Sequence, residues 1–262
     1  MRRVKVLVLY GHGINCDNET KRAFELVGAS ADRVHTNELI EGSQKLDEYH
    51  ILAFPGGFSF GDDIAAGKIH AIKFKYRLRE QLRRFIAERK LIIGICNGFQ
   101  IMVKLGILPG LDGDYWNQKV TLTFNDSGKF EDRWVYLKIE DSPCVFTKGL
   151  EHLYLPVRHG EGKLYTENSV LSKLKDKHLV VLRYVGPNGE KNPGYPYNPN
   201  GSLDDIAGIC DSSGRIFGLM PHPEGYQYRE NHPRHTREIL PDGGIGLEIF
   251  RNSVKYVKEN IL

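Results

Sequence analysis

A cysteine set between two glycines is the side chain best placed for covalent chemistry. Cys96 lies in the segment GICNG, between the apolar run Leu91–Ile95 and the helix-like stretch Phe99–Leu105. Such a turn between a strand and a helix holds the middle side chain at the carboxyl edge of a sheet, and the helix N-terminus favours a thiolate. The N–H of Asn97 is then placed to donate to an oxyanion. The alternative is a cysteine packed in the core at a strand end.

A thiol nucleophile also needs a base and a group that orients that base. Of the ten histidines, His222 is distinctive because it follows the apolar run Ile216–Met220 within the sequence PHPE. The two prolines favour an extended segment, in which His222 and Glu224 point to the same side. A carboxylate beside an imidazole fixes its tautomer, as in other triads. A surface His–Glu pair is the alternative, but together with the cysteine turn the pattern favours a triad of Cys96, His222 and Glu224.

The turn Pro55–Ser59, of sequence PGGFS, follows another apolar run and is expected to supply a second oxyanion donor. Its glycines leave backbone N–H groups unobstructed. A glycine-rich loop can also cradle phosphate, but the spacings GxGxxG and GxxxxGK[ST] are absent from this one.

Strands alternate with helices over the first 108 residues, which predicts an α/β fold with a doubly wound, mostly parallel sheet and flanking helices. The expected strands are Val4–Tyr10, Arg33–Thr36, His50–Phe54 and Leu91–Ile95, and the expected helices are Glu19–Val27, Ile69–Arg89 and Phe99–Leu105. In such a sheet the carboxyl ends of neighbouring strands face one crevice. The PGGFS turn and the cysteine turn are therefore expected to meet.

The middle of the chain predicts an antiparallel excursion. Val120–Phe124 and Trp134–Ile139 flank the turn-forming residues Asn125–Gly128. Further strands are expected at Leu179–Val185, Ile206–Asp211 and Arg215–Met220, the last two forming a hairpin, with a surface loop at Gly186–Gly201 and a final helix from Ile245.

The composition indicates an ordinary globular protein. The 262 residues are 40% hydrophobic and 26% charged, and we expect them to form one domain, residues 1–262. A net charge of +3 is too small to argue for nucleic acid. The absence of a long apolar run predicts a cytoplasmic protein that does not bind a membrane. The four cysteines form no CxxC pair, which argues against a metal site and against a disulfide framework.

Three motifs occur in an order that resembles the class I (triad) glutamine amidotransferases, whose fold is flavodoxin-like. They are PGGFSFGDD, GICNGFQ and PHPE. Other segments are similar to the glutaminase subunit of phosphoribosylformylglycinamidine synthase, an enzyme of purine biosynthesis. These segments are GHGINCDNET, FNDSGKFEDRW, LPVRHGEG, NPNGSLDDIAGICDSSGRIFG and DGGIGLEIFRNSVKYV.

The resemblance implies a role for individual residues. Cys96 attacks the side-chain amide of glutamine, His222 gives a proton to the departing ammonia, and Glu224 orients His222. The N–H groups of Gly57 and Asn97 form the oxyanion hole. The glutamine pocket is lined by Phe58, Ser59, Gln100, Asn125 and Ser127. The remaining cysteines, Cys16, Cys144 and Cys210, are taken as structural.

The resemblance also implies partners. Ammonia passes to an ATP-dependent synthetase subunit that makes formylglycinamidine ribonucleotide, and a small third subunit joins the complex. No cofactor is expected in this chain, since ATP and Mg belong to the synthetase. The loop Gly186–Gly201 and the segment Gln227–Arg237 are the expected interfaces.

Two other functions stay open at this point. One is another Cys-elbow α/β hydrolase or peptidase-like protein, although those usually place a histidine directly after the cysteine, where this chain has Asn97. The other is a catalytically silent binding subunit, which the presence of all three triad residues disfavours.

Overall fold

The computed structural model describes residues 3–262, and strands alternate with helices as far as Leu105 and mostly follow one another after that. The strands are β1 (Lys5–Tyr10), β2 (Ser30–His35), β3 (Ile51–Phe54), β4 (Leu91–Ile95), β5 (Val120–Phe124), β6 (Glu131–Ile139), β7 (His152–His159), β8 (Glu161–Thr166), β9 (Val180–Val185), β10 (Ile206–Cys210) and β11 (Ile216–Leu219). The helices are α1 (Asp17–Leu26), α2 (Thr36–Glu41), α3 (Lys68–Arg77), α4 (Arg79–Ala87), α5 (Asn97–Leu105), α6 (Asn168–Asp176) and α7 (Leu247–Asn260). None of the helices within residues 3–262 is long and apolar enough to cross a membrane.

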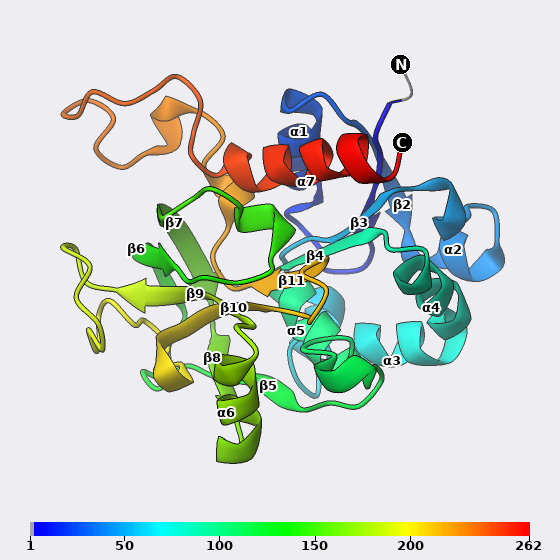
Figure 1. Cartoon of the computed structure of the whole chain (residues 1–262), viewed down its shortest axis with the longest axis horizontal. Helices are drawn as coiled ribbons and strands as arrows, with labels where there is room; N and C mark the ends of the chain where they lie inside the picture. Colours follow the sequence, from blue (N-terminus) through cyan, green and yellow to red (C-terminus); the bar gives the residue numbers. More distant parts are fainter. Residues whose placement is uncertain (1–2) are drawn as a thin grey trace.

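One large sheet organises the molecule, in the strand order β2-β1-β3-β4-β11-β10-β9-β6-β7. Its first five strands are parallel and follow the flavodoxin-like order, with β11 in the fifth place. Helices α1 and α7 pack together on one face of these strands, and α3 and α5 pack together on the other (Figure 1). Every residue of β3, β4 and β11 is buried, because helices cover both faces. The predicted α/β class and parallel core are confirmed.

The second half of the sheet is antiparallel. Strands β10 and β11 form the predicted hairpin, and β9, β6 and β7 extend the sheet beyond it. The two strands around the turn Asn125–Gly128 do not pair with each other, however. Strand β5 pairs with β8 in a separate two-stranded sheet, and β6 pairs with β7 and β9. Strands β7 and β8 and helices α2 and α6 were not predicted from the sequence, and β2 spans Ser30–His35 rather than Arg33–Thr36.

Helix α1 spans Asp17–Leu26 rather than Glu19–Val27, and α7 begins at Leu247 rather than at Ile245. Two further differences bear on the packing and the site. The expected helix Ile69–Arg89 is two helices, α3 and α4, because the backbone of Leu78 leaves the helical conformation (φ −126°, ψ 4°). The Leu78 side chain is buried at this break, so the apolar spacing continues across it. Helix α5 begins at Asn97 rather than at Phe99, which puts Asn97 in its first turn.

The parallel strands bring three predicted turns to one edge of the sheet. The turn after β3, the cysteine turn after β4 and the PHPE segment after β11 all lie at carboxyl ends. The contact between the first two is very close: a Cβ atom at Gly98, in the first turn of α5, would lie 1.9 Å from the carbonyl oxygen of Phe54. Glycine at 98 therefore sets how closely α5 approaches the end of β3.

This contact predicts that Gly98→Ala lowers the stability of the fold. Alanine gains about 1 kcal/mol in helix propensity, but the clash with a backbone oxygen is expected to cost at least about 3 kcal/mol more than that gain. The thermal unfolding midpoint, followed by circular dichroism, should fall by more than about 6 °C.

Gly160→Ala is the matched control, because a Cβ atom there would meet nothing within 4 Å. Its midpoint should stay within about 2 °C of the wild type. Equal midpoints for the two variants would contradict the proposed close contact.

Candidate active site

The cysteine turn has the strained geometry of a nucleophile elbow. Cys96 joins β4 to α5 and has φ 51° and ψ −107°, a backbone conformation that residues other than glycine rarely adopt. The turn is held by the Cys96 N–H, which donates to the Leu219 carbonyl (2.8 Å), and by the Gln100 N–H, which donates to the Cys96 carbonyl (3.0 Å). The thiol itself is 4% exposed and lies 3.6 Å from the Arg158 carbonyl oxygen. The predicted turn is confirmed, and its sulfur lies under the surface.

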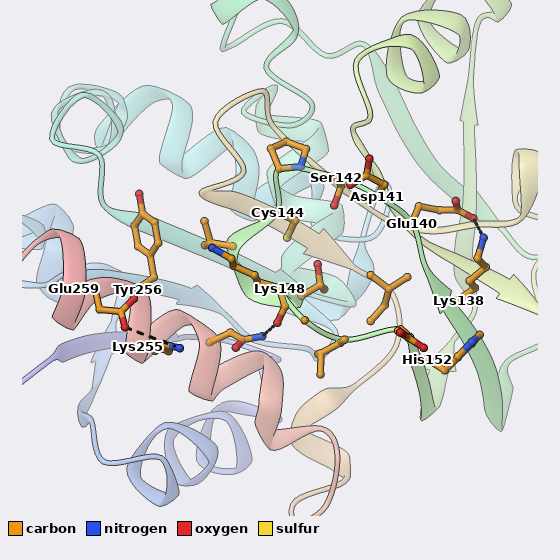
Figure 2. A pocket seen from close by; sticks show the side chains of 18 of the residues that line it. Lys138, Glu140, Asp141, Ser142, Cys144, Lys148, His152, Lys255, Tyr256 and Glu259 are labelled. Atoms are coloured by element: carbon orange, nitrogen blue, oxygen red, sulfur yellow. Dashed lines mark hydrogen bonds and ion pairs between the residues drawn. The ribbon is translucent and has the colours of Figure 1, made fainter.

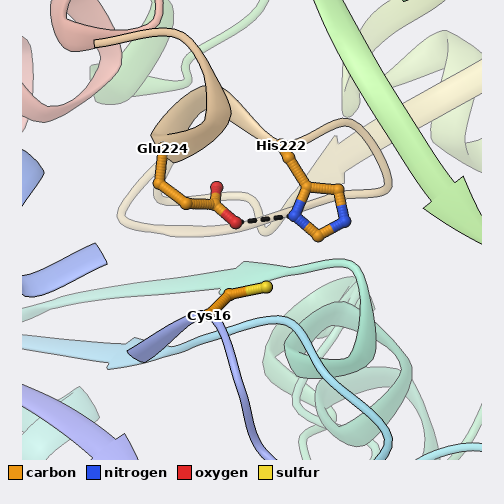
Figure 3. A group of neighbouring side chains, drawn as sticks. All are labelled: Cys16, His222 and Glu224. Atoms are coloured by element: carbon orange, nitrogen blue, oxygen red, sulfur yellow. Dashed lines mark hydrogen bonds and ion pairs between the residues drawn. The ribbon is translucent and has the colours of Figure 1, made fainter. Parts of the chain in front are cut away.

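His222 and Glu224 form a buried pair behind the elbow. The Nδ1 atom of His222 lies 2.6 Å from Oε1 of Glu224, and the two residues are 2% and 3% exposed (Figure 3). The expectation of an extended segment is wrong from Pro223 onwards. Pro223–Gly225 form a single 3₁₀ turn, which brings the carboxylate back to the ring. The other ring nitrogen, Nε2, is buried and has no hydrogen-bond partner among the described residues.

The charge state of His222 follows from its neighbours. Burial by itself lowers the pKa of the imidazole, but the Glu224 carboxylate and Cys96 outweigh this effect and raise the pKa well above its ordinary value. Glu224 thus holds the proton of Nδ1 and stabilises the imidazolium. His222 can therefore act as an acid near neutral pH.

The glycine turn after β3 offers a free N–H group. Gly57 bridges to Ile14, but the bridge uses the Phe58 N–H (2.7 Å to the Gly13 carbonyl) and the Gly56 carbonyl. Within residues 3–262 the N–H of Gly57 has no hydrogen-bond partner. Its φ of 147°, and a Cβ position only 2.7 Å from the Gly13 oxygen, require glycine.

The Asn97 side chain ties this turn to the elbow. Its Oδ1 accepts from the Ser59 N–H (3.2 Å), and its Nδ2 donates to Asp62 Oδ1 (3.1 Å) and to Gln100 Oε1 (2.9 Å). Gln100 in turn donates to the Glu161 carbonyl. The backbone N–H of Asn97 is among the first of α5, which have no partner within a helix. Among the described residues, Asn97 therefore has a free backbone N–H group, and its side chain also holds the turn that contains Gly57.

A cavity of about 270 Å³ opens onto the His222–Glu224 pair. Its lining residues come from four loops, the first turn of α1 and the end of β7: Asn15, Cys16, Glu19, Gly57, Phe58, Phe130, Arg158, His222, Glu224 and Gly225. The rings of Phe58 and Phe130, 43% and 52% exposed, lie 6.1 Å apart. Cys96 is not among the lining residues.

Some predicted pocket residues lie elsewhere. Asn125 is buried and its amide is already engaged, accepting from the Gly162 N–H (3.0 Å) and donating to the His159 carbonyl (2.8 Å). Ser127 lines a different hollow, beside Tyr195 and Gly201. Of the predicted pocket residues, Phe58 lines the cavity, and Ser59 and Gln100 belong to the network around Asn97. The role of each in glutamine binding stays a prediction.

Cys16 is the site residue that sequence reasoning missed. It was taken as structural, yet it lines the cavity and its sulfur lies within 4.8 Å of donor atoms of His222 and Glu224 (Figure 3). The signal was present, since the segment GHGINCD follows β1, whose carboxyl end faces the same edge as the elbow. Arg158 and Phe130, from the antiparallel half, carried no such signal.

A larger cavity, of about 1020 Å³, lies at the other edge of the sheet. It is lined by the end of β6, the start of β7 and one side of α7 (Figure 2). Because β6 is antiparallel to β4, the end of β6 lies at the edge opposite to Cys96. This cavity is therefore separate from the candidate active site.

The fold and the site together define a class. A family model described as a CobB/CobQ-like glutamine amidotransferase domain matches residues 3–257. A solved glutamine amidotransferase from Thermotoga maritima has the same fold, with a TM-score of 0.55 at 15% identity. The chain therefore contains a glutamine amidotransferase domain.

Comparison with individual proteins narrows the class. The subunit PurQ of phosphoribosylformylglycinamidine synthase from Dehalococcoides mccartyi is 51% identical over 260 residues, which cover 99% of this chain and 100% of that protein. PurQ of Methanococcus maripaludis is 45% identical over 263 residues, covering 96% of this chain and 98% of that one. A chain in the solved structure of PurLQS from Thermotoga maritima has a TM-score of 0.73 at 30% identity, covering 98% of this chain and 100% of that chain. The chain belongs to the PurQ family, the subunits of phosphoribosylformylglycinamidine synthase in purine biosynthesis.

The buried pair predicts how Glu224→Gln changes the titration of His222. The substitution removes the carboxylate that favours the imidazolium and leaves the burial that disfavours it. The pKa of His222 should therefore fall by at least about 1 pH unit. A ring-proton NMR titration, with His222 assigned through His222→Asn, measures it directly.

Glu19→Gln is the control, because Glu19 lines the same cavity without touching the imidazole. The pKa of His222 should stay nearly unchanged in this variant. A His222 titration that is the same in Glu224→Gln and the wild type would show that the carboxylate does not set its charge.

Proposed function

We propose that Cys96, His222 and Glu224 hydrolyse L-glutamine to glutamate and ammonia. The thiol sulfur attacks the carbonyl carbon of the side-chain amide, and the resulting oxyanion accepts hydrogen bonds from the N–H groups of Gly57 and Asn97. His222 gives a proton to the departing ammonia, leaving a γ-glutamyl thioester. His222 then takes a proton from a water molecule, which attacks the thioester and releases glutamate with the free thiol.

One observation carries this proposal: a cysteine in a strained elbow adjoins a buried His222–Glu224 pair whose Nε2 is free. A packed structural cysteine needs neither the strained backbone nor an unpartnered imidazole nitrogen. The free N–H of Gly57 adds the acceptor site that amide hydrolysis requires. A silent binding subunit has no use for this arrangement, and a peptidase of the kind considered above would have its histidine at position 97.

The partners follow from the relatives. The name PurLQS of the Thermotoga maritima structure joins three letters, which we read as three subunits. We propose that this chain likewise works with a synthetase subunit and a small third subunit. Ammonia released at Cys96 passes to the synthetase, which converts formylglycinamide ribonucleotide to formylglycinamidine ribonucleotide. ATP and Mg act in the synthetase, this chain works without a cofactor of its own, and the complex operates in the cytoplasm.

Access to the thiol supports a dependence on these partners. Cys96 is 4% exposed, and the Arg158 carbonyl covers its sulfur. Glutamine therefore reaches Cys96 only when the cavity wall moves. We propose that docking of the synthetase over the half-exposed rings of Phe58 and Phe130 moves this wall and aligns the Gly57 turn.

Cys96→Ala separates the two halves of the reaction. In the assembled complex it should lower glutamine-dependent synthesis by more than about a thousandfold, since no thioester can form. Synthesis from added ammonia should keep its rate, because the synthetase is intact. Both rates are read from product formation, and glutamate release is measured with and without the synthetase.

Cys144→Ala is the control, a buried thiol near the other sheet edge that should retain both activities. Loss of both activities in the Cys96 variant would contradict the division of labour between the subunits.

Asn97→Ala tests the link between elbow and oxyanion turn while keeping the backbone N–H at position 97. The Ser59 N–H loses its acceptor, so the turn is no longer held in place. We expect kcat/KM for glutamine to fall about 10- to 100-fold, equivalent to about 1–3 kcal/mol, with ammonia-dependent synthesis unchanged.

Asn117→Ala removes an exposed asparagine amide outside this network and should leave both rates unchanged. A wild-type rate in Asn97→Ala would mean that the turn is positioned without this side chain.

A further inference from the structure

A second thiol lies beside the triad, on the side away from the free imidazole nitrogen. A Cβ atom placed on Gly56 would lie 3.3 Å from the sulfur of Cys16, 3.3 Å from Nδ1 of His222 and 2.7 Å from its Cε1. Cys16 therefore faces the Nδ1 edge of the ring, where Glu224 also lies (Figure 3). The absence of a side chain at Gly56 leaves the space between these three groups open.

The three groups form a donor set for a metal ion. One sulfur, one imidazole nitrogen and one carboxylate oxygen lie within 4.8 Å of one another, from Cys16, His222 and Glu224. His222 and Glu224 are each more than nine-tenths buried, and Oε2 of Glu224 has no hydrogen-bond partner among the described residues. The Glu224 carboxylate is therefore bonded through Oε1 alone, and it has capacity left to bind a cation.

The chemistry of the donors selects the ion. Sulfur, nitrogen and oxygen ligands in a small tetrahedral site suit Zn²⁺, whereas Mg²⁺ and Ca²⁺ prefer oxygen alone. Bonds of about 2.0–2.3 Å to one ion place ligand atoms about 3–4 Å apart. On metal binding, the distance between His222 Nδ1 and Glu224 Oε1 would lengthen slightly from 2.6 Å, and the Cys16 sulfur would move closer to both atoms.

We propose that Cys16, His222 and Glu224 form an inhibitory Zn²⁺ site on the back of the catalytic pair. The ion bonds to the Cys16 sulfur, to Nδ1 of His222 and to a Glu224 oxygen. The thiol proton, now donated to Asn15 Oδ1 (3.4 Å), passes to water. The ion displaces the Nδ1 proton, which also passes to water, and the neutral ring keeps its one remaining proton on Nε2.

This tautomer stops the reaction. Nε2 is the nitrogen left free to exchange protons in the reaction. With the metal on Nδ1, Nε2 carries the only proton of a neutral ring, so it has no lone pair with which to accept a proton and is too weak an acid to protonate the departing ammonia. Glu224 is also withdrawn from its role as the orienting group. Zn²⁺ binding is independent of the proposed catalytic roles, whereas the inhibition rests on them, so the two are measured separately.

Binding is tested on the full chain with Co²⁺ as a spectroscopic substitute for Zn²⁺. A thiolate ligand produces a sulfur-to-cobalt charge-transfer band in the near ultraviolet. The band should appear in the wild type, in Cys96→Ala and in the control Cys144→Ala, and it should be absent from Cys16→Ala and Cys16→Ser. A band that is lost in Cys96→Ala but kept in Cys16→Ala would assign the metal to the catalytic thiol and overturn the proposal.

Inhibition is tested in the assembled complex by glutamate release under increasing Zn²⁺. The concentration that halves the rate should rise at least about tenfold in Cys16→Ser, each variant being compared with its own metal-free rate. Ammonia-dependent synthesis at the same Zn²⁺ concentrations should be unaffected, which excludes an effect on the synthetase. Equal sensitivity of wild type and Cys16→Ser would overturn the inhibitory role. A cobalt band that still depends on Cys16 would then show that the metal binds but the catalytic assignment fails.

Discussion

The close approach of the elbow helix to the end of β3 is the constraint on which the site depends. Gly98 lies against the Phe54 carbonyl with no room for a side chain, so the turns after β3 and β4 have one possible separation. Asn97 spans that separation with its amide, bonding to Ser59. The two candidate oxyanion donors, Gly57 and Asn97, therefore keep a fixed relation that neither loop sets by itself. The close packing at Gly98 thus fixes the spacing of the two candidate oxyanion donors.

The charge of His222 is set by a neighbouring carboxylate and not by burial. A histidine as deeply buried as His222 would be neutral on grounds of desolvation alone, as His159 is, where burial lowers the pKa to about 3. Glu224 reverses the outcome at His222, so two histidines of similar burial differ in charge because only one has a carboxylate at 2.6 Å. His159 instead hydrogen-bonds to Asn125, in the FNDSG segment that also contacts Asn200 of NPNGS. Of these two family-like segments, the residues that contact each other lie apart from the cavity, and Phe130 of the first segment, FNDSGKFEDRW, lines it.

The sequence predicted the parallel half of the fold well and the antiparallel half poorly. Continuous apolar runs such as Leu91–Ile95 are buried on both faces and are visible at once. Strand β7 contains a proline and has polar residues at both ends, and β8 is half polar, so neither has that signature. The pairing of β5 with β8 joins residues about forty positions apart, which no local pattern specifies. The triad could be predicted because its residues follow detectable strands, whereas Arg158 at the end of β7 could not.

Cys16 illustrates where motif reasoning ends. A motif names residues by their place in a known reaction, so a cysteine outside the motif is assigned to the core by default. Topology contradicts that default, since every loop at the carboxyl ends of β1, β3, β4 and β11 faces the same crevice. A thiol in such a loop is near the triad whatever its role. The Glu224 carboxylate, which holds a proton on His222 through Oε1, also lies within reach of that thiol and has its second oxygen unpaired among the described residues. The carboxylate that sets the charge of His222 is therefore also one donor of the proposed metal site.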